Sequence, residues 1–563
     1  MMRIALAVLV AVTGCIDHVD LGSDSLPGLV AIDVSPAEQT LAIALPSSPQ
    51  LVAYSAVGHF YDGATRDITA QLVWTTDNPA PGSFTVPGTY TSSNAAGGHV
   101  VIRAAHDAIA ATAALTVAIS ATLVDDSFPP PSSDLFGSDA QVVTDIMKSP
   151  SIAYPVDATM FPQQLAPALF QYVHSTMTDA YRLSFGSDVL ALTIITGADR
   201  WRPDPDVWAL IERSHLGATA TFEVDATSST APATIYAGAP ITIAFAPDSP
   251  GGAVYFGAKM KQGVLRGTLG SSTATKVYPP PGDSTPTDDE VVSLDGQTMA
   301  VAYMDHLRTI DLATSSVIAA TNVPMGWAAV SPDGTLVVVA NMGMLSLHDT
   351  ITGQGIGSPD GHIDLPGQMA THPDWSPDGR QIAVTLGNSV SNDDLKGGSI
   401  ASLAYLGAGA WGPPQVLVTS TGDNDNNYFP KWSPDGGYLA YVHANGPAKD
   451  APTAELRLVA AGGGAPIVLQ RASHQLALTT SPILADTMPA WAPGPRPWLA
   501  FASTRPYGVV RPMTGSSQIW ITAIDFAQGD PSSSAFWMPA QDISGTNTTP
   551  SWPPIVTTTA ATQ

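Results

Sequence analysis

The sequence predicts an all-β chain with two β-sandwich domains followed by a six-bladed β-propeller. Gly and Pro contribute 49 residues each and charged residues only 12%, a balance typical of short strands joined by turns. Between residues 29 and 249, short β-branched runs alternate with turn residues. From residue 250 a turn motif followed by an apolar strand recurs, and a repeat of this length indicates a propeller.

Length and charge limit the possible functions. A chain of 563 residues is expected to form three or four units, since domains average roughly 100 to 200 residues. The formal net charge is -26, from 48 acidic and 22 basic residues. Such a surface repels phosphate backbones, so nucleic acid is not expected as a partner.

The first 14 residues have the pattern of a secretion signal. Arg3 precedes an apolar run from Ile4 to Val12, which is too short to span a membrane as a helix, because that requires about 20 residues. The run leads into Val12-Thr-Gly-Cys15, which resembles the lipobox of bacterial lipoproteins. The resemblance implies a signal peptide over residues 1–14, lipidation of Cys15 and a polar tether over residues 15–28.

The lipobox resemblance also implies a location. Several acyl chains on one cysteine anchor a protein stably in a membrane. Ile16 rather than Asp follows the cysteine, which by analogy with enterobacterial sorting favours the outer membrane. We therefore expect an outer membrane lipoprotein that faces the periplasm or the cell surface. Because Cys15 is the single cysteine, no intrachain disulfide can form.

Residues 29–120 contain short strands spaced about ten residues apart, as in a β-sandwich. The motifs Tyr61-Asp-Gly63, Val73-Trp74 and Gly88-Thr-Tyr90 follow one another in the order found in bacterial Ig-like domains of the group-two type, which this segment resembles. The resemblance implies a spacer or adhesive module. Trp74 is expected to be a core residue.

The next two segments are predicted from composition and short strands. Residues 121–149 include Phe128-Pro-Pro-Pro131 and are predicted to be a Pro-rich linker. Residues 150–249 again contain short strands and loosely resemble a fibronectin type III sandwich. Alternatively, Leu165–Tyr181 forms a helix within an α/β insertion.

The repeated motif ends in Asp-Gly and is followed each time by an apolar strand. Pro presets the turn, Asp binds turn amides and Gly accepts a positive φ, so the motif predicts a hairpin rather than an active site. A fifth copy, Trp491-Ala-Pro493-Gly494, is degenerate. The structural turn residues are Asp295, Gly296, Asp333, Gly334, Asp378, Gly379, Asp435 and Gly436.

The array of Trp-Ser-Pro-Asp-Gly units over residues 250–556 resembles the WD-like repeats of TolB-type propellers. Its last unit, Thr549-Pro-Ser-Trp552, supplies only an inner strand, whereas the segments starting at Gly252 and Gly263 supply only outer strands. Joining them gives a composite sixth blade closed by both ends of the domain, which removes an open sheet edge. Residues 557–563 are expected to be a tail.

Motifs for catalysis are missing from the sequence. Neither Gly-x-Ser-x-Gly nor His-Glu-x-x-His occurs, and without further cysteines the haem motif of some related lipoprotein propellers is excluded. Asp423, Asp425 and Asn427 place oxygen ligands at alternate positions, as calcium loops do, although the distal Glu is missing. We expect no enzyme and no cofactor, with calcium as the alternative.

Three functions follow from this organisation. The first is a non-catalytic envelope lipoprotein whose propeller binds a protein, peptide or glycan of the cell envelope. TolB-type propellers bind a peptidoglycan-associated lipoprotein, but this chain has no obvious TolB N-terminal domain. The second is an envelope hydrolase with a site built from propeller loops, using Asp423, Asp425, His372 and His443. The third is a surface adhesin that acts through the Ig-like domain.

Overall fold

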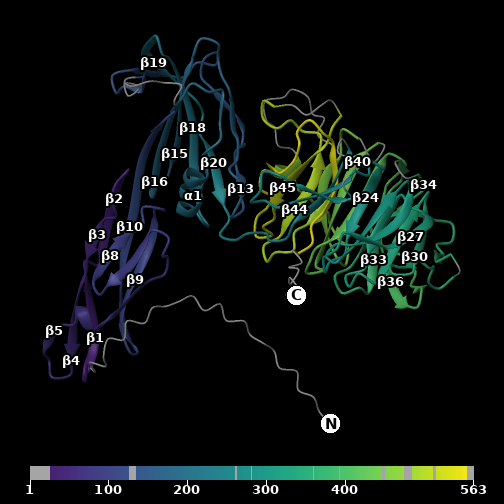
Figure 1. Ribbon diagram of the computed structural model, residues 1–563, viewed down its shortest axis with the longest axis horizontal. Coiled ribbons are helices and arrows are strands. Elements are labelled where there is room, and N and C mark those ends of the chain that lie inside the picture. Colours follow the sequence, from purple (N-terminus) through teal and green to yellow (C-terminus); the bar gives the residue numbers. More distant parts are fainter. Residues whose placement is uncertain are drawn as a thin grey trace. The chain divides into compact units, whose positions relative to one another are not determined.

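Figure 1 shows the computed structural model, which describes residues 26–125, 135–259, 263–280, 282–358, 360–391, 394–446, 451–473, 485–510 and 515–554. The predicted signal peptide, Cys15, nearly all of the tether and the tail lie outside these residues. The chain divides into two compact units, residues 1–121 and residues 122–563. Among the described residues, none of the helices is long and apolar enough to cross a membrane.

The first unit is built of strands around an aromatic core. Tyr54, Trp74, Phe84 and Tyr90 contact one another with ring centroids 5.3 to 6.1 Å apart, and Trp74 is a core residue, as predicted. Its indole N–H donates to the Thr69 carbonyl at 2.9 Å. Polar and apolar residues alternate along the strands, as expected where one sheet face is buried. The immunoglobulin-like assignment stays a prediction.

The elements of this unit are β1 (Leu29–Ser35), β2 (Glu38–Leu45), β3 (Leu51–Ala53), β4 (Ser55–Phe60), β5 (Thr65–Asp67), η1 (Thr69–Gln71), β6 (Val73–Thr76), β7 (Gly82–Val86), β8 (Thr89–Ser92), β9 (Gly98–His106) and β10 (Ile109–Val124). Strand β10 pairs in parallel with β2 and antiparallel with β9. Separate sheets have the orders β1-β4-β5 and β3-β8-β7.

The segment before the propeller combines sheets with one helix. Its elements are β11 (Gln141–Val143), β12 (Ser151–Tyr154), β13 (Thr159–Phe161), β14 (Phe170–Val173), β15 (Ala180–Gly186), β16 (Leu190–Thr196), β17 (Arg200–Trp201), α1 (Pro205–Ser214), β18 (Thr219–Ser228), β19 (Ala231–Ala237) and β20 (Ile241–Phe245). The main sheet contains β11-β19-β18-β15-β16, with β20 beside β18 and β13 beside β20.

Two predictions for this segment are wrong in part. The helix is α1, not Leu165–Tyr181, which contains β14 and the start of β15. Pro167 disfavours a helix there, whereas Asp204 and Pro205 are typical of a helix start. The predicted linker also contributes strands, because β10 extends to Val124 and β11 pairs with β19.

The segment packs against the propeller within the second unit. Phe161 contacts Phe536 with ring centroids 5.7 Å apart, and the Ser534 amide donates to the Ala158 carbonyl at 3.1 Å. These contacts join residues 150–249 to the propeller, so this segment is not a separate compact unit.

The described residues after 250 form six antiparallel sheets, which we number as blades. Blade 1 is β24 (Thr287–Val292), β25 (Thr298–Tyr303), β26 (His306–Asp311) and β27 (Ser316–Pro324). Blade 2 is β28 (Trp327–Val330), β29 (Leu336–Asn341), β30 (Met344–Asp349) and β31 (His362–Ile363). Blade 3 is β32 (Met369–Trp375), β33 (Gln381–Gly387), β36 (Ser399–Gly407), β37 (Ala410–Trp411) and β38 (Gln415–Val418).

Blade 4 is β39 (Asp425–Trp432), β40 (Tyr438–Asn445), β41 (Glu455–Ala460) and β42 (Ile467–Val468). Blade 5 is β43 (Asp486–Trp491), β44 (Trp498–Ser503), β45 (Gln518–Ala523) and β46 (Phe536–Trp537). Blade 6 is β47 (Asn547–Ser551), β21 (Val254–Ala258), β22 (Gly263–Gly267) and β23 (Thr275–Tyr278). A hairpin of β34 (Ser389–Val390) and β35 (Leu395–Lys396) and the short helix α2 (Gln470–Ser473) complete the elements.

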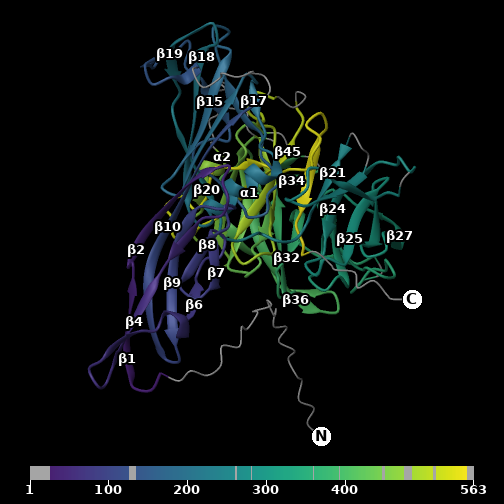
Figure 2. The same cartoon turned by 60° about the vertical axis from the view of Figure 1, so that its left-hand side comes forward.

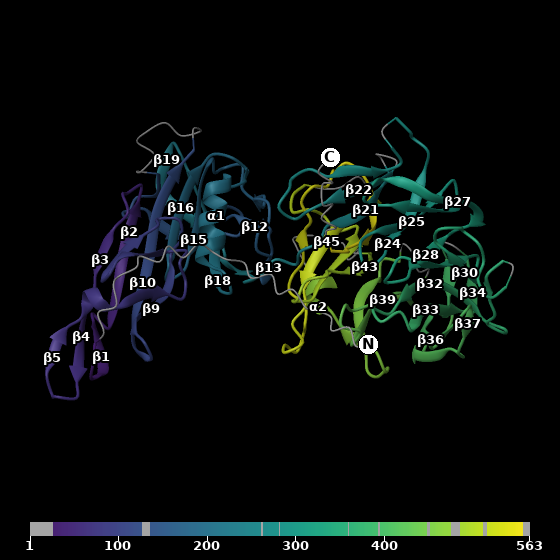
Figure 3. The ribbon, with the colours of Figure 1, turned by 60° about the horizontal axis from the view of Figure 1, so that its bottom comes forward.

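The six blades close into a ring. Inner strands contact in the cyclic order β24, β28, β32, β39, β43, β47 and back to β24. Strand β47 pairs antiparallel with β21, with Tyr255 opposite Ser551, and Figures 2 and 3 show the C-terminal chain beside the teal strands of this blade. The predicted six-bladed propeller with a composite last blade is confirmed.

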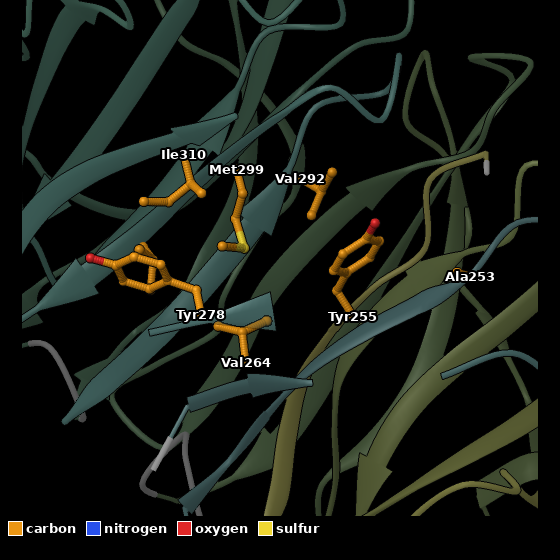
Figure 4. Close-up of a cluster of buried hydrophobic side chains, with 8 residues drawn as sticks. Ala253, Tyr255, Val264, Tyr278, Val292, Met299 and Ile310 are labelled. Carbon is orange, nitrogen blue, oxygen red and sulfur yellow. The ribbon is translucent and has the colours of Figure 1, made fainter. Parts of the chain in front are cut away.

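An apolar cluster holds the composite blade against blade 1. Tyr255, Val264 and Tyr278 of blade 6 pack on Val292, Met299 and Ile310 of blade 1 (Figure 4). These side chains are less than one tenth exposed. Because blade 6 is joined from both ends of the domain, burial of this cluster stabilises the closed ring.

Candidate functional site: the axial cavity

The inner strands carry one residue each at an equivalent position near the propeller axis. It lies three places before the apolar residue that precedes the turn motif. We call these six residues the axial ring: Asp289, Trp327, His372, Phe429, Met488 and Thr549. All six line the same cavity.

A bulge shapes the strand at five of the six ring positions. In β24, β32, β39, β43 and β47 the register shifts there. The ring residue adopts a φ between 48° and 58°: Asp289, His372, Phe429, Met488 and Thr549. In β28, where Trp327 lies, the pairing has no such shift. A bulge redirects a side chain away from the regular pleat, so the repeat itself presents the ring residues to the axis.

The cavity has a volume of about 150 Å³ and is lined by the inner strands of all six blades. A dry cavity of this size holds a group as large as benzene. Five prolines line its turn end: Pro332, Pro377, Pro434, Pro493 and Pro553. The cavity therefore has room for one side chain or a small molecule.

One side of the cavity is aromatic. The ring centroids of His372 and Phe429 lie 3.8 Å apart, those of Trp327 and Phe429 4.7 Å, and those of Trp327 and His372 5.0 Å. Trp327 and Phe429 come from blades 2 and 4, so their contact passes across blade 3. All three side chains are buried.

Blade 1 contributes acidic residues to the cavity wall. Asp289 is half-buried on the ring, and Glu290 beside it is 4% exposed. The Thr549 hydroxyl donates to Glu290 Oε1 at 2.8 Å, while Glu290 Oε2 has no hydrogen-bond partner among the described residues. Burial raises the pKa of Glu290 well above its ordinary value, and the neighbouring carboxylates Asp289 and Asp288 add to this rise.

A charged pair joins blades 3 and 4 at the cavity wall. Lys431 Nζ donates to Asp374 Oδ1 at 2.9 Å, and the Trp432 amide donates to Asp374 Oδ2 at 2.8 Å. Burial raises the pKa of Asp374, while Lys431 acts against this rise. The charge of Lys431 is thus compensated within the wall.

The structural turn residues lie at the hairpins that follow the inner strands. In each copy the motif serine bonds to the aspartate two residues later, at 2.5 or 2.6 Å, and the serine oxygen also accepts an amide five residues on. Gly296, Gly334, Gly379 and Gly436 have φ between 69° and 73°. The aspartates paired with these serines are Asp295, Asp333, Asp378 and Asp435.

The calcium candidates each hydrogen-bond to neighbouring protein groups. Asp425 Oδ2 accepts from the Thr421 amide and hydroxyl at 2.8 and 2.6 Å. Asp423 accepts from Asn388 at 3.1 Å, and the Asn427 amide donates to the Gly398 carbonyl at 3.0 Å. Among the described residues there is no group of three or more His, Cys, Asp or Glu side chains placed to hold a metal ion.

The structure brings two of the hydrolase candidates together, His443 and Asp425, but not the whole set. His372 belongs to the axial ring, whereas His443 lies on β40, where its Nδ1 is 3.1 Å from Asn427 Oδ1 and 3.4 Å from Asp425 Oδ1. Sequence reasoning missed the other ring residues. The signal was present, because Pro two places before Trp marks the bulge in four of the repeats.

No known protein family matches the chain, and no curated protein does. Several solved structures are similar to part of the chain. A putative TolB from Agrobacterium tumefaciens is 13% identical with a TM-score of 0.32, covering 54% of this chain and 99% of that one. The WD40 domain of SCAP from fission yeast is 13% identical with a TM-score of 0.27, covering 45% of this chain and 56% of that one.

The β-propeller domain of Cps50 (Swd1) from Myceliophteria thermophila is 12% identical with a TM-score of 0.26, covering 43% of this chain and 95% of that one. All three are β-propeller or WD-type structures by their descriptions or names. Because these similarities are low, the propeller assignment here depends on the strand pairing and on the cyclic contacts of the inner strands.

Proposed function

We propose that this protein is a non-catalytic binding protein of the cell envelope, and that the axial cavity receives part of a protein or peptide partner. One observation carries the proposal. Each of six blades contributes an equivalent inner-strand residue to one cavity, and in five of them a bulge directs that residue there. Concave sites lined by apolar and aromatic side chains with a few polar groups are where proteins bind ligands.

The size of the cavity suits an anchoring side chain of a larger partner. At about 150 Å³ it is smaller than the pockets of roughly 300 to 1,000 Å³ that enclose drug-sized molecules. Interfaces concentrate their binding energy in a few anchors inserted into desolvated pockets. The surrounding propeller face would then supply complementary contacts around the anchor.

Display screening of the full chain against random peptides, in parallel with an oligosaccharide array, tests this proposal. We expect peptides to be enriched, and Phe429→Leu to weaken their binding roughly tenfold or more, because it removes an aromatic anchor contact. Phe526→Leu is the matched control, since Phe526 is 39% exposed and is not among the residues lining the axial cavity.

Equal binding by the Phe429→Leu and Phe526→Leu variants would place the peptide site elsewhere. Enrichment of glycans without peptides would make the protein a glycan binder, and binding of neither would contradict the proposal.

A further inference from the structure

We propose that the axial cavity takes a single cationic side chain, lysine or arginine, of a peptide partner, held against the aromatic pair Trp327 and Phe429 and by the carboxylate of Asp289. This rests on the proposed binding function and names the chemistry that the cavity recognises.

The charges on the described cavity wall favour a cation. The wall contains the acidic residues Asp289, Glu290 and Asp374, and its one lysine or arginine among the described residues is Lys431. Lys431 is already paired with Asp374 at 2.9 Å. The carboxylate of Asp289 disfavours an anionic ligand and attracts a positive one, and a cation bound beside it would also favour the ionised form of Glu290.

The aromatic side of the cavity adds a second contribution. Lysine and arginine bind over the faces of tryptophan and phenylalanine rings, more strongly where water is excluded. Trp327 is 9% exposed and Phe429 is 5% exposed, and their rings meet at an interplanar angle of 73°. Both residues line the cavity, so a cation bound there would lie beside this aromatic pair.

Glu290 makes the acidic side unusual within the repeat. Blades 3 to 6 have proline at this position, namely Pro373, Pro430, Pro489 and Pro550. Glu290 Oε2 lacks a hydrogen-bond partner among the described residues, which is costly for a buried polar atom. An incoming ammonium or guanidinium group beside Asp289 would lower this cost by supplying positive charge nearby.

The net charge acts in the same direction at longer range. With a formal net charge of -26, the protein attracts cationic segments and accelerates their encounter with the propeller. The prolines at the turn end of the cavity are apolar, and they suit the aliphatic part of a lysine or arginine side chain.

The test uses the full chain with 4-fluorophenylalanine in place of Phe429, so that a ¹⁹F signal reports from the cavity itself. It is titrated with four capped pentapeptides, Gly-Ser-X-Ser-Gly, in which X is lysine, arginine, norleucine or glutamate. We expect the lysine and arginine peptides to bind roughly fivefold or more tightly than the norleucine peptide. The preference should shrink as salt is raised.

Variant Asp289→Asn should abolish most of this preference. The matched control is Asp305→Asn, because Asp305 also has a positive φ, of 61°, and lies on the exposed turn between β25 and β26 of the same blade. Asparagine tolerates this backbone conformation, so both variants keep the local geometry. If Asp289→Asn fails to fold, the salt dependence of the lysine preference in the unmodified chain decides.

Norleucine or glutamate binding as tightly as lysine would overturn the cationic ligand while leaving the proposed binding function intact. A ¹⁹F signal that moves with none of the four peptides, although the screened peptides bind, would also overturn it. Failure of both the screened and the four designed peptides would instead remove the proposed function.

Discussion

At the residue scale, the turn motif depends on glycine for its backbone rather than for space. Gly379 has a φ of 69°, and a Cβ added there would approach its nearest neighbour, Pro332, only to 3.8 Å. The cost of a side chain is therefore the cost of the left-handed conformation, about 1 to 2 kcal/mol.

Gly379→Ala should lower the free energy of unfolding by about 1 to 2 kcal/mol, as measured by urea unfolding followed through tryptophan fluorescence. Gly422→Ala is the control, because Gly422 has open space around its Cβ position and its φ is outside the left-handed range. Its stability should be unchanged or slightly raised. Equal losses in the two variants would show that the turn conformation is not the cause.

Glu290 is the residue whose ionisation most directly opposes ring closure. Its carboxyl group accepts the Thr549 hydroxyl of β47 across the joint between blades 1 and 6. Because burial raises its pKa in the folded state, its contribution to stability is fully present at low pH. That contribution is lost as the pH rises from the unfolded-state pKa through the raised folded-state pKa.

Glu290→Gln should remove this dependence. Relative to the unmodified protein, the variant should gain stability between about pH 5 and about pH 8, with a slope of at most about 1.4 kcal/mol per pH unit. Urea unfolding at both pH values measures the difference. A difference that does not change with pH would mean that Glu290 titrates normally.

At the scale of the element, one inner strand joins its blade to both neighbours. Successive side chains of a strand point to opposite sheet faces. In β32, Asp374 therefore accepts from Lys431 and Trp432 of blade 4, while the Trp375 indole donates to the Ala329 carbonyl of blade 2 at 3.2 Å. In the same way, Ser551 of β47 joins blade 6 to blade 1, because its hydroxyl oxygen accepts the Val292 amide at 3.1 Å.

Asp374→Ala should lower the free energy of unfolding by about 2 to 3 kcal/mol, because it leaves the partly buried Lys431 without its carboxylate and the Trp432 amide without its acceptor. Asp199→Ala is the control, since the Asp199–Arg200 pair is about half-exposed and should change stability by less than about 0.5 kcal/mol. A similar small effect for Asp374→Ala would show that blades 3 and 4 are held by apolar packing alone.

At the scale of the whole molecule, the repeat predicted the propeller well because its period is a property of composition and spacing. Four copies of Ser-x-Asp-Gly, the degenerate fifth copy at Trp491 and the single inner strand that ends at Trp552 were enough to predict six blades and their closure. The axial ring was not predicted, because which residue faces the axis depends on a bulge that shifts the alternation of the strand. The segment at 150–249 has no repeat, so its sheet order and helix α1 depended on long-range packing.

The proposed location depends on the amino-terminal region rather than on the propeller. If Cys15 carries the lipid, Cys15→Ser should release the protein from membranes, because the acyl chains supply the anchoring free energy. Fractionation and mass spectrometry of the membrane-bound protein measure both effects. An unmodified Cys15, or a variant that stays in the membrane fraction, would contradict the lipoprotein assignment.

Both ends of the repeat array meet in one blade and so enclose the axial cavity. Ala258 lies opposite Asn547 in the pairing of β21 with β47. In a chain with Cys15→Ser, the pair Ala258→Cys and Asn547→Cys should form an intramolecular disulfide under mild oxidation, detected by peptide mapping. The pair Ala258→Cys and Ser346→Cys, with Ser346 on blade 2, should not. A closed ring predicts the first bond alone, and its absence in the folded protein would contradict the account.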